Sequence, residues 1–397
     1  MLVKIEKLDN FGRGITYIDG KITFVYNALP YEEVDIEITK NNKKYFEARV
    51  LKYISKSFER CSNDCPKSDL CGGCNLRHVD YDFENKFKEK KVRDIMMKFA
   101  GVNSDVINPI CYSSMNNYRN KVILHGKNGN LGLYRSDSND VVPIDECLIL
   151  NNRINDIIKI VNRINKNIEE AIIKTSNDLE KCLVSIKGEV SDINELINVC
   201  DVLILNGKFL TKEKHIITSI GKKKYYQSCD SFFQVNTTLT ELLYDKVYEC
   251  LEKYNNSNVL DLYCGTGTIG IYVSDLCSNI VGVDYNKSNI DDANMNKKLN
   301  NVNNISFICD KVENRIDEFK NIDVVIVDPP RAGLDPKTIK YLISIAPEAI
   351  IYVSCDPVTL ARDIKNLSDR FDAISITPFN MFPRTYHCES ITVLERR

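Results

Sequence analysis

The feature that most constrains this chain is an alternation of apolar, strand-like runs with helical segments from Asn258 onward. Such an alternation predicts a parallel β-sheet flanked by helices, because parallel strands need long crossover connections. The first run, Val259–Tyr263, leads into a loop of the form G-x-G-x-x-G with Gly265, Gly267 and Gly270. These glycines permit a tight turn and close packing beside a bound cofactor. We therefore expect an α/β domain that holds a nucleotide-containing cofactor at this loop.

Asp284 lies nineteen residues after Gly265, at the end of the next strand-like run, Ile280–Val283. A carboxylate at that position can accept hydrogen bonds from ribose hydroxyls. The glycine motif and this carboxylate together leave two cofactors open, NAD and S-adenosylmethionine.

The sequence Asp328-Pro329-Pro330-Arg331 follows the apolar run Asp323–Val327. Two prolines make a stiff, non-helical turn, since proline fixes φ and lacks an N–H. Such a turn projects a polar side chain into the crevice where open α/β sheets bind ligands. This pattern resembles that of methyltransferases that act on planar nucleobases, and it has no use in hydride transfer.

Cys355 ends a further apolar run and immediately precedes Asp356-Pro357, where a helix is expected to begin. Unpaired N–H groups at a helix N-terminus favour a thiolate, the form that attacks carbon. Glu389 precedes the last strand-like run and could act as a general base. Taken singly, each residue has a simpler interpretation, namely a buried structural cysteine and a solvated surface carboxylate.

Five separate motifs occur in the order found in a known family. They are Ser231–Asn236, Asp261–Gly265, Asp328–Arg331, Ser354–Pro357 and Phe382–Glu389. With them, nearly the whole chain resembles the S-adenosylmethionine-dependent RNA 5-methyluridine methyltransferases that carry an N-terminal TRAM domain. The resemblance implies a class I Rossmann-like methyltransferase domain with an N-terminal, OB-like β-barrel and a central α+β iron–sulfur domain.

The resemblance also implies the chemistry. Cys355 would add to carbon 6 of uracil, carbon 5 would take the methyl group, and Glu389 would then remove the proton from carbon 5. The target base would have to leave its stack. The residues expected to hold the cofactor are Gln234, Tyr263, Gly265, Asp284 and Asp328. The family usually has Glu where Asp284 stands, and His or Gln where Arg384 stands.

Four cysteines, Cys61, Cys65, Cys71 and Cys74, fall within fourteen residues. By spacing alone they could form a zinc site or part of an iron–sulfur site. The resemblance favours a 4Fe–4S cluster held by Cys65, Cys71, Cys74 and the remote Cys147, and it leaves Cys61 without a partner.

Three domains are expected, with residues 1–58 as an RNA-binding barrel, 59–228 as the central domain and 229–397 as the methyltransferase domain. Short β-rich runs with an Asp19-Gly20 turn support the barrel. From Tyr81 to Phe99 an apolar stripe predicts a helix with its lysines on the opposite face. The stretch from Asn151 to about Lys174 also has a helical pattern.

The composition of the chain says more about its cellular compartment than about its substrate. The net charge of −2 does not by itself indicate a nucleic-acid partner, and no apolar run is long enough to cross a membrane. Because the N-terminus lacks the apolar core of a signal peptide, we expect a cytoplasmic protein with no membrane contact and no obligate protein partner. Its fifteen cysteines then serve in burial, metal binding or catalysis, because cytosolic thiols stay reduced.

The family resemblance implies RNA as the partner, with 23S ribosomal RNA first and transfer RNA second. Two rival hypotheses are an RNA cytosine-5 methyltransferase that also uses a cysteine, and a non-catalytic iron–sulfur RNA-binding protein. Cys355 and Glu389 together argue against the second rival.

Overall fold

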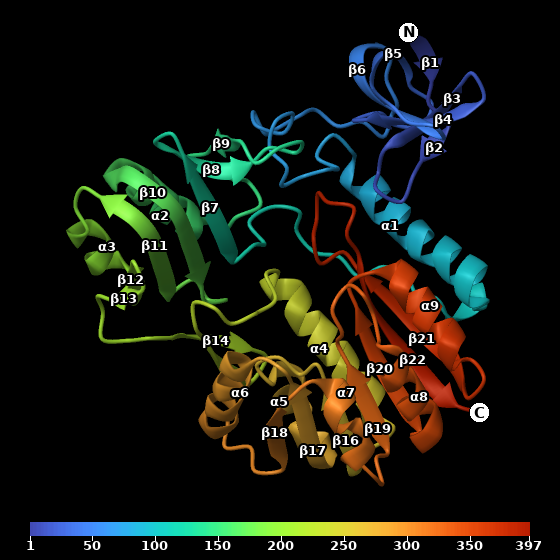
Figure 1. Ribbon diagram of the computed structural model, residues 1–397, viewed down its shortest axis with the longest axis vertical. Coiled ribbons are helices and arrows are strands. Elements are labelled where there is room, and N and C mark those ends of the chain that lie inside the picture. The colour runs from blue at the N-terminus through green and yellow to red at the C-terminus, as the bar shows by residue number, and fades with distance from the viewer.

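The computed structural model describes residues 1–397 and has three lobes (Figure 1). A small barrel lies at the N-terminal end, a β-sheet with two helices forms the middle lobe, and a helix-covered sheet forms the C-terminal lobe. No helix in the structure is both long enough and apolar enough to span a membrane.

The N-terminal lobe is a six-stranded sheet in the order β1-β5-β6-β4-β3-β2. Its strands are β1 (Leu2–Lys4), β2 (Lys7–Leu8), β3 (Gly14–Ile18), β4 (Lys21–Tyr26), β5 (Glu33–Asn41) and β6 (Tyr45–Ser55). The outer strands β1 and β2 are consecutive in the chain, so the two edges of the sheet meet and the barrel closes. Asp19 and Gly20 both have positive φ, 48° and 75°, as a two-residue hairpin turn requires.

The cysteine-rich segment that follows has little regular structure and leads into helix α1 (Tyr81–Ile95). The Asp80 carboxylate caps α1, and the helix continues as a single π-helical stretch, Met96–Ala100, which ends at Gly101 with φ 69°. The predicted helix is thus confirmed, and Lys86, Lys90 and Lys98 are exposed as expected, but the expectation was wrong for Lys88 and Lys91. Glu84, Lys88 and Lys91 are buried, because this face of α1 packs on the C-terminal lobe and contacts polar backbone there.

The middle lobe is a seven-stranded sheet in the order β13-β12-β11-β10-β7-β8-β9. Its strands are β7 (Lys121–Lys127), β8 (Asn130–Tyr134), β9 (Val141–Pro143), β10 (Asn165–Thr175), β11 (Cys182–Val190), β12 (Val202–Leu205) and β13 (Lys208–Phe209). Helices α2 (Asn152–Ile164) and α3 (Asn194–Val199) pack against it in one apolar core. The helix predicted to extend to Lys174 ends at Ile164, since the following residues pair with β7 and β11.

A hairpin, β14 (Ile216–Ile220) and β15 (Lys223–Gln227), leads from the middle lobe to helix α4 (Thr237–Glu252). The C-terminal sheet has the order β18-β17-β16-β19-β20-β22-β21. Its strands are β16 (Ser257–Leu262), β17 (Cys277–Asp284), β18 (Ile305–Cys309), β19 (Val324–Val327), β20 (Ala349–Ser354), β21 (Phe371–Phe379) and β22 (Glu389–Arg396). The first five strands in this order are parallel, and β22 runs antiparallel between β20 and β21.

Helices cover both faces of this sheet. They are α4, α5 (Thr268–Tyr272), α6 (Lys287–Leu299), α7 (Val312–Arg315), α8 (Pro336–Ile345) and α9 (Pro357–Leu367). Along β19, Val324 and Ile326 face one apolar core while Val325 and Val327 face the other, as expected for a strand buried on both sides. The end of α1 packs into the second of these cores with α8 and α9. The predicted parallel α/β sheet is confirmed.

Candidate active site

The expected site residues gather at one edge of the C-terminal sheet. Because β16, β17, β19 and β20 are parallel, their carboxyl ends meet there. Asp328 follows β19 directly, and Cys355 follows β20. Glu389 begins the antiparallel β22, whose Ser390 pairs with Ser354. Cys355 follows Ser354 and Glu389 precedes Ser390, so in this antiparallel pair the thiol and the proposed base lie next to the same paired residues.

The glycine loop after β16 has the backbone that such a loop needs. Gly265 and Gly267 have φ values of 53° and 73°, and a Cβ on Gly267 would lie 2.5 Å from the Phe307 ring. The Asp284 carboxylate accepts hydrogen bonds from Gly265 N at 3.1 Å and from Asn286 N at 2.8 Å. Asp284 thus fixes the loop and remains at the end of β17, where the sequence predicted a ribose contact.

Gln234 and Tyr263 lie in two different loops, one before α4 and one directly after β16. Gln234 is buried just before α4, and its carbonyl accepts a hydrogen bond from Asn120 Nδ2 at 3.2 Å. Tyr263 has a positive φ of 63°, and its hydroxyl lies 3.4 Å from Glu313 Oε1. A non-glycine residue in this conformation is uncommon and often marks a functional loop.

Three carboxyl groups in the crevice hold their protons unusually tightly. Burial raises the pKa of Glu389 to about 8, with a further contribution from the charge of Asp328. Desolvation alone raises the pKa of Asp328 to about 7. Burial, followed by the charges of Asp328 and Asp284, raises the pKa of Asp261 to about 8. Perturbed acids in a crevice are typical of active sites.

Asp261 begins the sequence motif Asp261–Gly265, but the sequence predicted no role for it. Both of its carboxyl oxygens are buried without a hydrogen-bond partner, and Glu389 Oε2 is likewise unpaired. Buried polar atoms are normally satisfied. Asp261 Oδ2 faces Gly270, where a Cβ would lie 2.9 Å from it, which leaves Asp261 Oδ1 and Glu389 Oε2 as the oxygens that a hydrogen-bond-donating ligand would satisfy. The position of Asp261, inside the strand that leads to the glycine loop, was the available signal.

The expectation that the helix N-terminus favours a Cys355 thiolate was wrong for the unliganded site. Burial, with the charges of Glu389 and Asp328, raises the pKa of Cys355 to about 11. The Asp356 side chain already accepts from Val358 N and Thr359 N, so the free N–H groups of α9 are capped. Arg331 acts in the opposite direction and lowers this pKa.

The cysteines expected to bind a cluster come from two parts of the chain, the loop that holds Cys65, Cys71 and Cys74 and the segment at Cys147. Cys71, Cys74 and Cys147 have raised pKa values, caused first by burial and then by one another and Cys65; that of Cys74 reaches about 12. These thiols are near neighbours, but no three His, Cys, Asp or Glu side chains form a ready-made metal site. Cys61 instead donates to the carbonyls of Arg77 and Val79.

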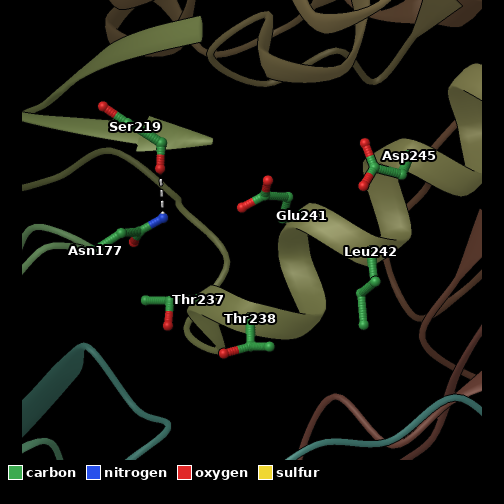
Figure 2. A pocket seen from close by; sticks show the side chains of 7 residues that line it. All are labelled: Asn177, Ser219, Thr237, Thr238, Glu241, Leu242 and Asp245. Carbon is green, nitrogen blue, oxygen red and sulfur yellow. Dashed lines mark hydrogen bonds between the residues drawn. The ribbon is translucent and has the colours of Figure 1, made fainter. Parts of the chain in front are cut away.

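One well-defined hollow in the structure is not lined by the crevice residues. It measures about 350 Å³ and lies between the N-terminal part of α4 and the loop at Asn177 (Figure 2). Its lining residues are Asn177, Ser219, Thr237, Thr238, Glu241, Leu242 and Asp245. None of the predicted site residues borders it, so this hollow is separate from the candidate site.

A parallel sheet with an antiparallel seventh strand and a glycine loop beside buried acids defines a Rossmann-like methyltransferase. The family model for tRNA (uracil-5-)-methyltransferases matches residues 153–397, and the TRAM domain model matches residues 1–51. The chain belongs to this uracil-5-methyltransferase family and is an enzyme. This confirms the resemblance and rules against a non-catalytic protein.

Relatives along almost the whole chain agree with this assignment. An uncharacterized RNA methyltransferase of Caldanaerobacter subterraneus is 32% identical, covering 99% of this chain and 97% of the relative. One of Clostridium tetani is 33% identical and covers 96% and 93%. The crystal structure of Pyrococcus abyssi tRNA (uracil-54, C5)-methyltransferase with S-adenosyl-L-homocysteine superposes with a TM-score of 0.81 at 26% identity, covering 99% and 100%.

Proposed function

We propose that this protein transfers a methyl group from S-adenosylmethionine to carbon 5 of a uracil in RNA. The observation that carries the proposal is the meeting of a thiol and a carboxyl across one strand pair. Cys355 and Glu389 flank the pair Ser354–Ser390, with Asp328 near enough to raise the pKa of both. A nucleophile and a base on one side of a crevice suit an addition–elimination reaction on a planar ring.

In the proposed reaction, Cys355 Sγ loses its proton to solvent and forms a bond to carbon 6 of uracil. The electron pair of the carbon 5–carbon 6 double bond moves toward the ring carbonyl, which makes carbon 5 nucleophilic. The methyl group is supplied by S-adenosylmethionine. Glu389 then takes the proton from carbon 5, the double bond re-forms, and the thiolate leaves carbon 6. With its pKa raised to about 8, Glu389 in its ionised form is a stronger base than an ordinary carboxylate.

The residues proposed to hold the cofactor are those at the carboxyl ends of β16, β17 and β19 together with one loop residue. They are Gln234, Tyr263, Gly265, Asp284 and Asp328. The unpaired Oδ1 of Asp261 adds a sixth candidate, because a cationic or hydrogen-bond-donating group of the cofactor would satisfy it. The P. abyssi enzyme, similar over its whole length, binds S-adenosyl-L-homocysteine at its own site.

Two RNA classes are proposed as substrates. Ribosomal RNA of the large subunit is the first, because it is the RNA that the family resemblance implies for a member with the cluster cysteines Cys65, Cys71, Cys74 and Cys147. Transfer RNA is the second, and the likeness to a tRNA (uracil-54, C5)-methyltransferase over 99% of this chain favours it. Mapping 5-methyluridine in RNA from cells that lack this protein distinguishes the two, since only the true target loses the modification.

We further propose that Cys65, Cys71, Cys74 and Cys147 bind a 4Fe–4S cluster. In a cluster each thiolate binds a different iron, so the four sulfurs lie further apart than around a single ion. The supporting observation is that these half-buried thiols lie near enough to raise one another's pKa, as a shared donor set requires. When bound, the cluster would cross-link the loop after the barrel to the segment before α2. Zinc without acid-labile sulfide in anaerobically purified protein would contradict this proposal.

Residues 1–58 are proposed as an RNA-binding barrel, 59–228 as the central domain and 229–397 as the methyltransferase domain. The working compartment is proposed to be the cytoplasm, where reduced thiols and RNA coexist.

The test of the main proposal uses methyl-labelled S-adenosylmethionine and unmodified RNA from cells lacking this protein. We expect label in 5-methyluridine after digestion to nucleosides. Label in 5-methylcytidine instead would favour the cytosine-5 hypothesis, and no transferred label would contradict the proposed function.

A further inference from the structure

The segment that leads to Glu389, residues 380–388, has no regular secondary structure and crosses the buried face of α1. Three polar residues of that helix face it at helical spacing, namely Glu84, Lys88 and Lys91. Their exposed fractions are 0%, 0% and 8%. Fully buried charges are rare, because removing an ion from water is costly unless it is paired and hydrogen-bonded.

Lys88 is the centre of this group. Its Nζ donates to Glu84 Oε1 at 2.9 Å, to Asn380 Oδ1 at 2.6 Å and to the Phe382 carbonyl at 3.0 Å. All three donors of the ammonium are therefore used, two of them on the segment itself. Asn380 also donates to Glu84 Oε1 and to Asn85 Oδ1, which closes the network.

Arg384 attaches the middle of the segment to the same helix. Its backbone has a φ of 69°, and its N–H donates to Glu84 Oε1 at 2.9 Å. Its guanidinium lies 3.6 Å from Glu84 Oε2, within ion-pair distance but too far for a hydrogen bond. Its carbonyl accepts from both Asn75 and Leu76, each at 2.9 Å. The segment is thus held between α1 and the chain that follows Cys74.

Lys91 holds the far end of the segment. Its Nζ donates to the Tyr386 carbonyl at 2.7 Å, and no carboxylate lies within ion-pair distance of it. Burial lowers the pKa of Lys91 accordingly. An unpaired, mostly buried lysine costs stability, and its one strong contact is with a backbone carbonyl three residues before Glu389.

We propose that Glu84, Lys88 and Lys91 are positioning residues that set where the Glu389 carboxylate stands in the crevice. This inference rests on the proposed role of Glu389 as the base. Apolar side chains of the same volume would pack α1 on the lobe equally well or better. What they could not do is fix the carbonyls of Phe382 and Tyr386, and through them the entry of the chain into β22.

The test separates positioning from folding, because Glu389 acts only after the methyl group has moved. If Glu389 is misplaced, the bond between Cys355 and carbon 6 persists on methylated RNA. The measurement is the ratio of labelled, covalent protein–RNA adduct on a denaturing gel to released, methylated RNA. The RNA is unmodified total RNA from cells lacking this protein, and S-adenosylmethionine carries the label.

Three variants are compared with the full-length protein, namely Lys88→Met, Lys91→Met and the double variant Glu84→Gln/Lys88→Met. Lys91→Met leaves no orphaned carboxylate and is expected to fold. The double variant removes Glu84 and Lys88 together but leaves the buried Arg384 guanidinium without a carboxylate, so its folding is established first by circular dichroism. We expect the adduct ratio to rise about 10- to 100-fold in each variant, the loss caused by misplacing a group by about an ångström. Affinity for S-adenosylmethionine should stay within about twofold.

Lys90→Met is the matched control, since Lys90 lies on the exposed face of the same helix with a side chain 74% exposed. Its adduct ratio should equal that of the unaltered protein. Glu389→Gln is the reference for a fully trapped adduct. If Glu389→Gln traps nothing, the proposed function is wrong. If Glu389→Gln traps adduct while the folded double variant and Lys91→Met do not, the positioning role is wrong.

Discussion

Two groups of buried charge in this protein are built in opposite ways. Around α1, Glu84 and Lys88 face each other, and every hydrogen of the ammonium has an acceptor. Glu84 Oε2 accepts no hydrogen bond, but the Arg384 guanidinium lies 3.6 Å from it as a second counter-charge. In the crevice, Asp261 and Glu389 have unpaired oxygens and no cation at ion-pair distance. In the first group the main cost in folding free energy is the desolvation of the charges, which their pairing offsets. In the second group the raised pKa values keep the carboxyl groups protonated near neutral pH.

The difference distinguishes charges that hold structure from charges that await a ligand. A group with its own counter-charge is satisfied in the free protein and gains nothing from substrate. An unpaired carboxyl gains a partner only when a ligand donates to it. The predictions below test this distinction, beginning with the crevice.

Cys355→Ala removes the proposed nucleophile and should have the largest effect. We expect methyl transfer to fall on the order of 10⁶-fold, as when other enzymes lose a nucleophile. Binding of S-adenosylmethionine, measured by calorimetry, should remain. Measurable turnover by this variant would mean that another group adds to carbon 6.

Glu389→Gln keeps the size of the side chain but cannot accept the proton. Loss of a general base typically costs about 10²- to 10⁴-fold in rate, so product release should fall by that amount. Single-turnover measurements should show the methyl label transferring before the block. A block of the transfer step itself would place Glu389 earlier in the reaction.

Lys88→Met breaks this group and leaves the buried Glu84 carboxylate with only the Arg384 guanidinium, 3.6 Å away, as its counter-charge. Breaking a buried pair costs about 3–5 kcal/mol in unfolding free energy. Urea unfolding should show this loss, and Glu84→Gln/Lys88→Met should recover much of it. A double variant as unstable as the single one would mean that the pair contributes through its hydrogen bonds to Asn380 and Phe382.

The crevice acids should make the free protein less stable as pH rises. The folded-state pKa of Glu389, about 8, lies above its ordinary value of 4.5. Its stabilising contribution is therefore complete below about pH 4.5 and is lost as pH rises through 8. Unfolding free energy should fall by a few kcal/mol between pH 5 and pH 8, and Glu389→Gln should flatten that decline. Equal slopes in the two proteins would contradict the burial of an unpaired acid.

Lys90→Met gives the smallest effect. Lys90 and Asp94 have the same spacing along α1 as Glu84 and Lys88, but their side chains are 74% and 58% exposed. Such a surface pair contributes about 0.5 kcal/mol or less. Thermal unfolding of this variant should match the unaltered protein closely, which would isolate burial as the source of the Lys88 effect.

Much of the fold could be predicted from local patterns. The glycine loop, the strand ends at Asp284 and Asp328, and the helix from Tyr81 all follow from short-range periodicity and turn chemistry. The crossing of residues 380–388 over α1 could not, because it joins residues nearly 300 positions apart. Periodicity also misassigned Lys88, since it treats every lysine as a surface residue. The strand after Ile164 was missed because its pairing with β7 and β11, rather than its own sequence, decides its conformation.

For the site, the sequence predicted which residues would come together but not their protonation states. Cys355 was expected as a thiolate beside a helix N-terminus, yet Asp356 occupies those N–H groups and two carboxyls lie nearby. Which residues hold the cofactor, and whether four cysteines hold a cluster, stay predictions that binding measurements can decide.

The pairing of Ser354 with Ser390 has a consequence for how this chain can vary. Since side chains alternate faces along a strand, deleting one residue within β22 would turn the Glu389 carboxylate, or the apolar residues after it, to the opposite side of the sheet. Insertions in the loop between α9 and β21 leave that register untouched. Length changes should therefore be tolerated before Phe371 and lethal to activity after Glu389.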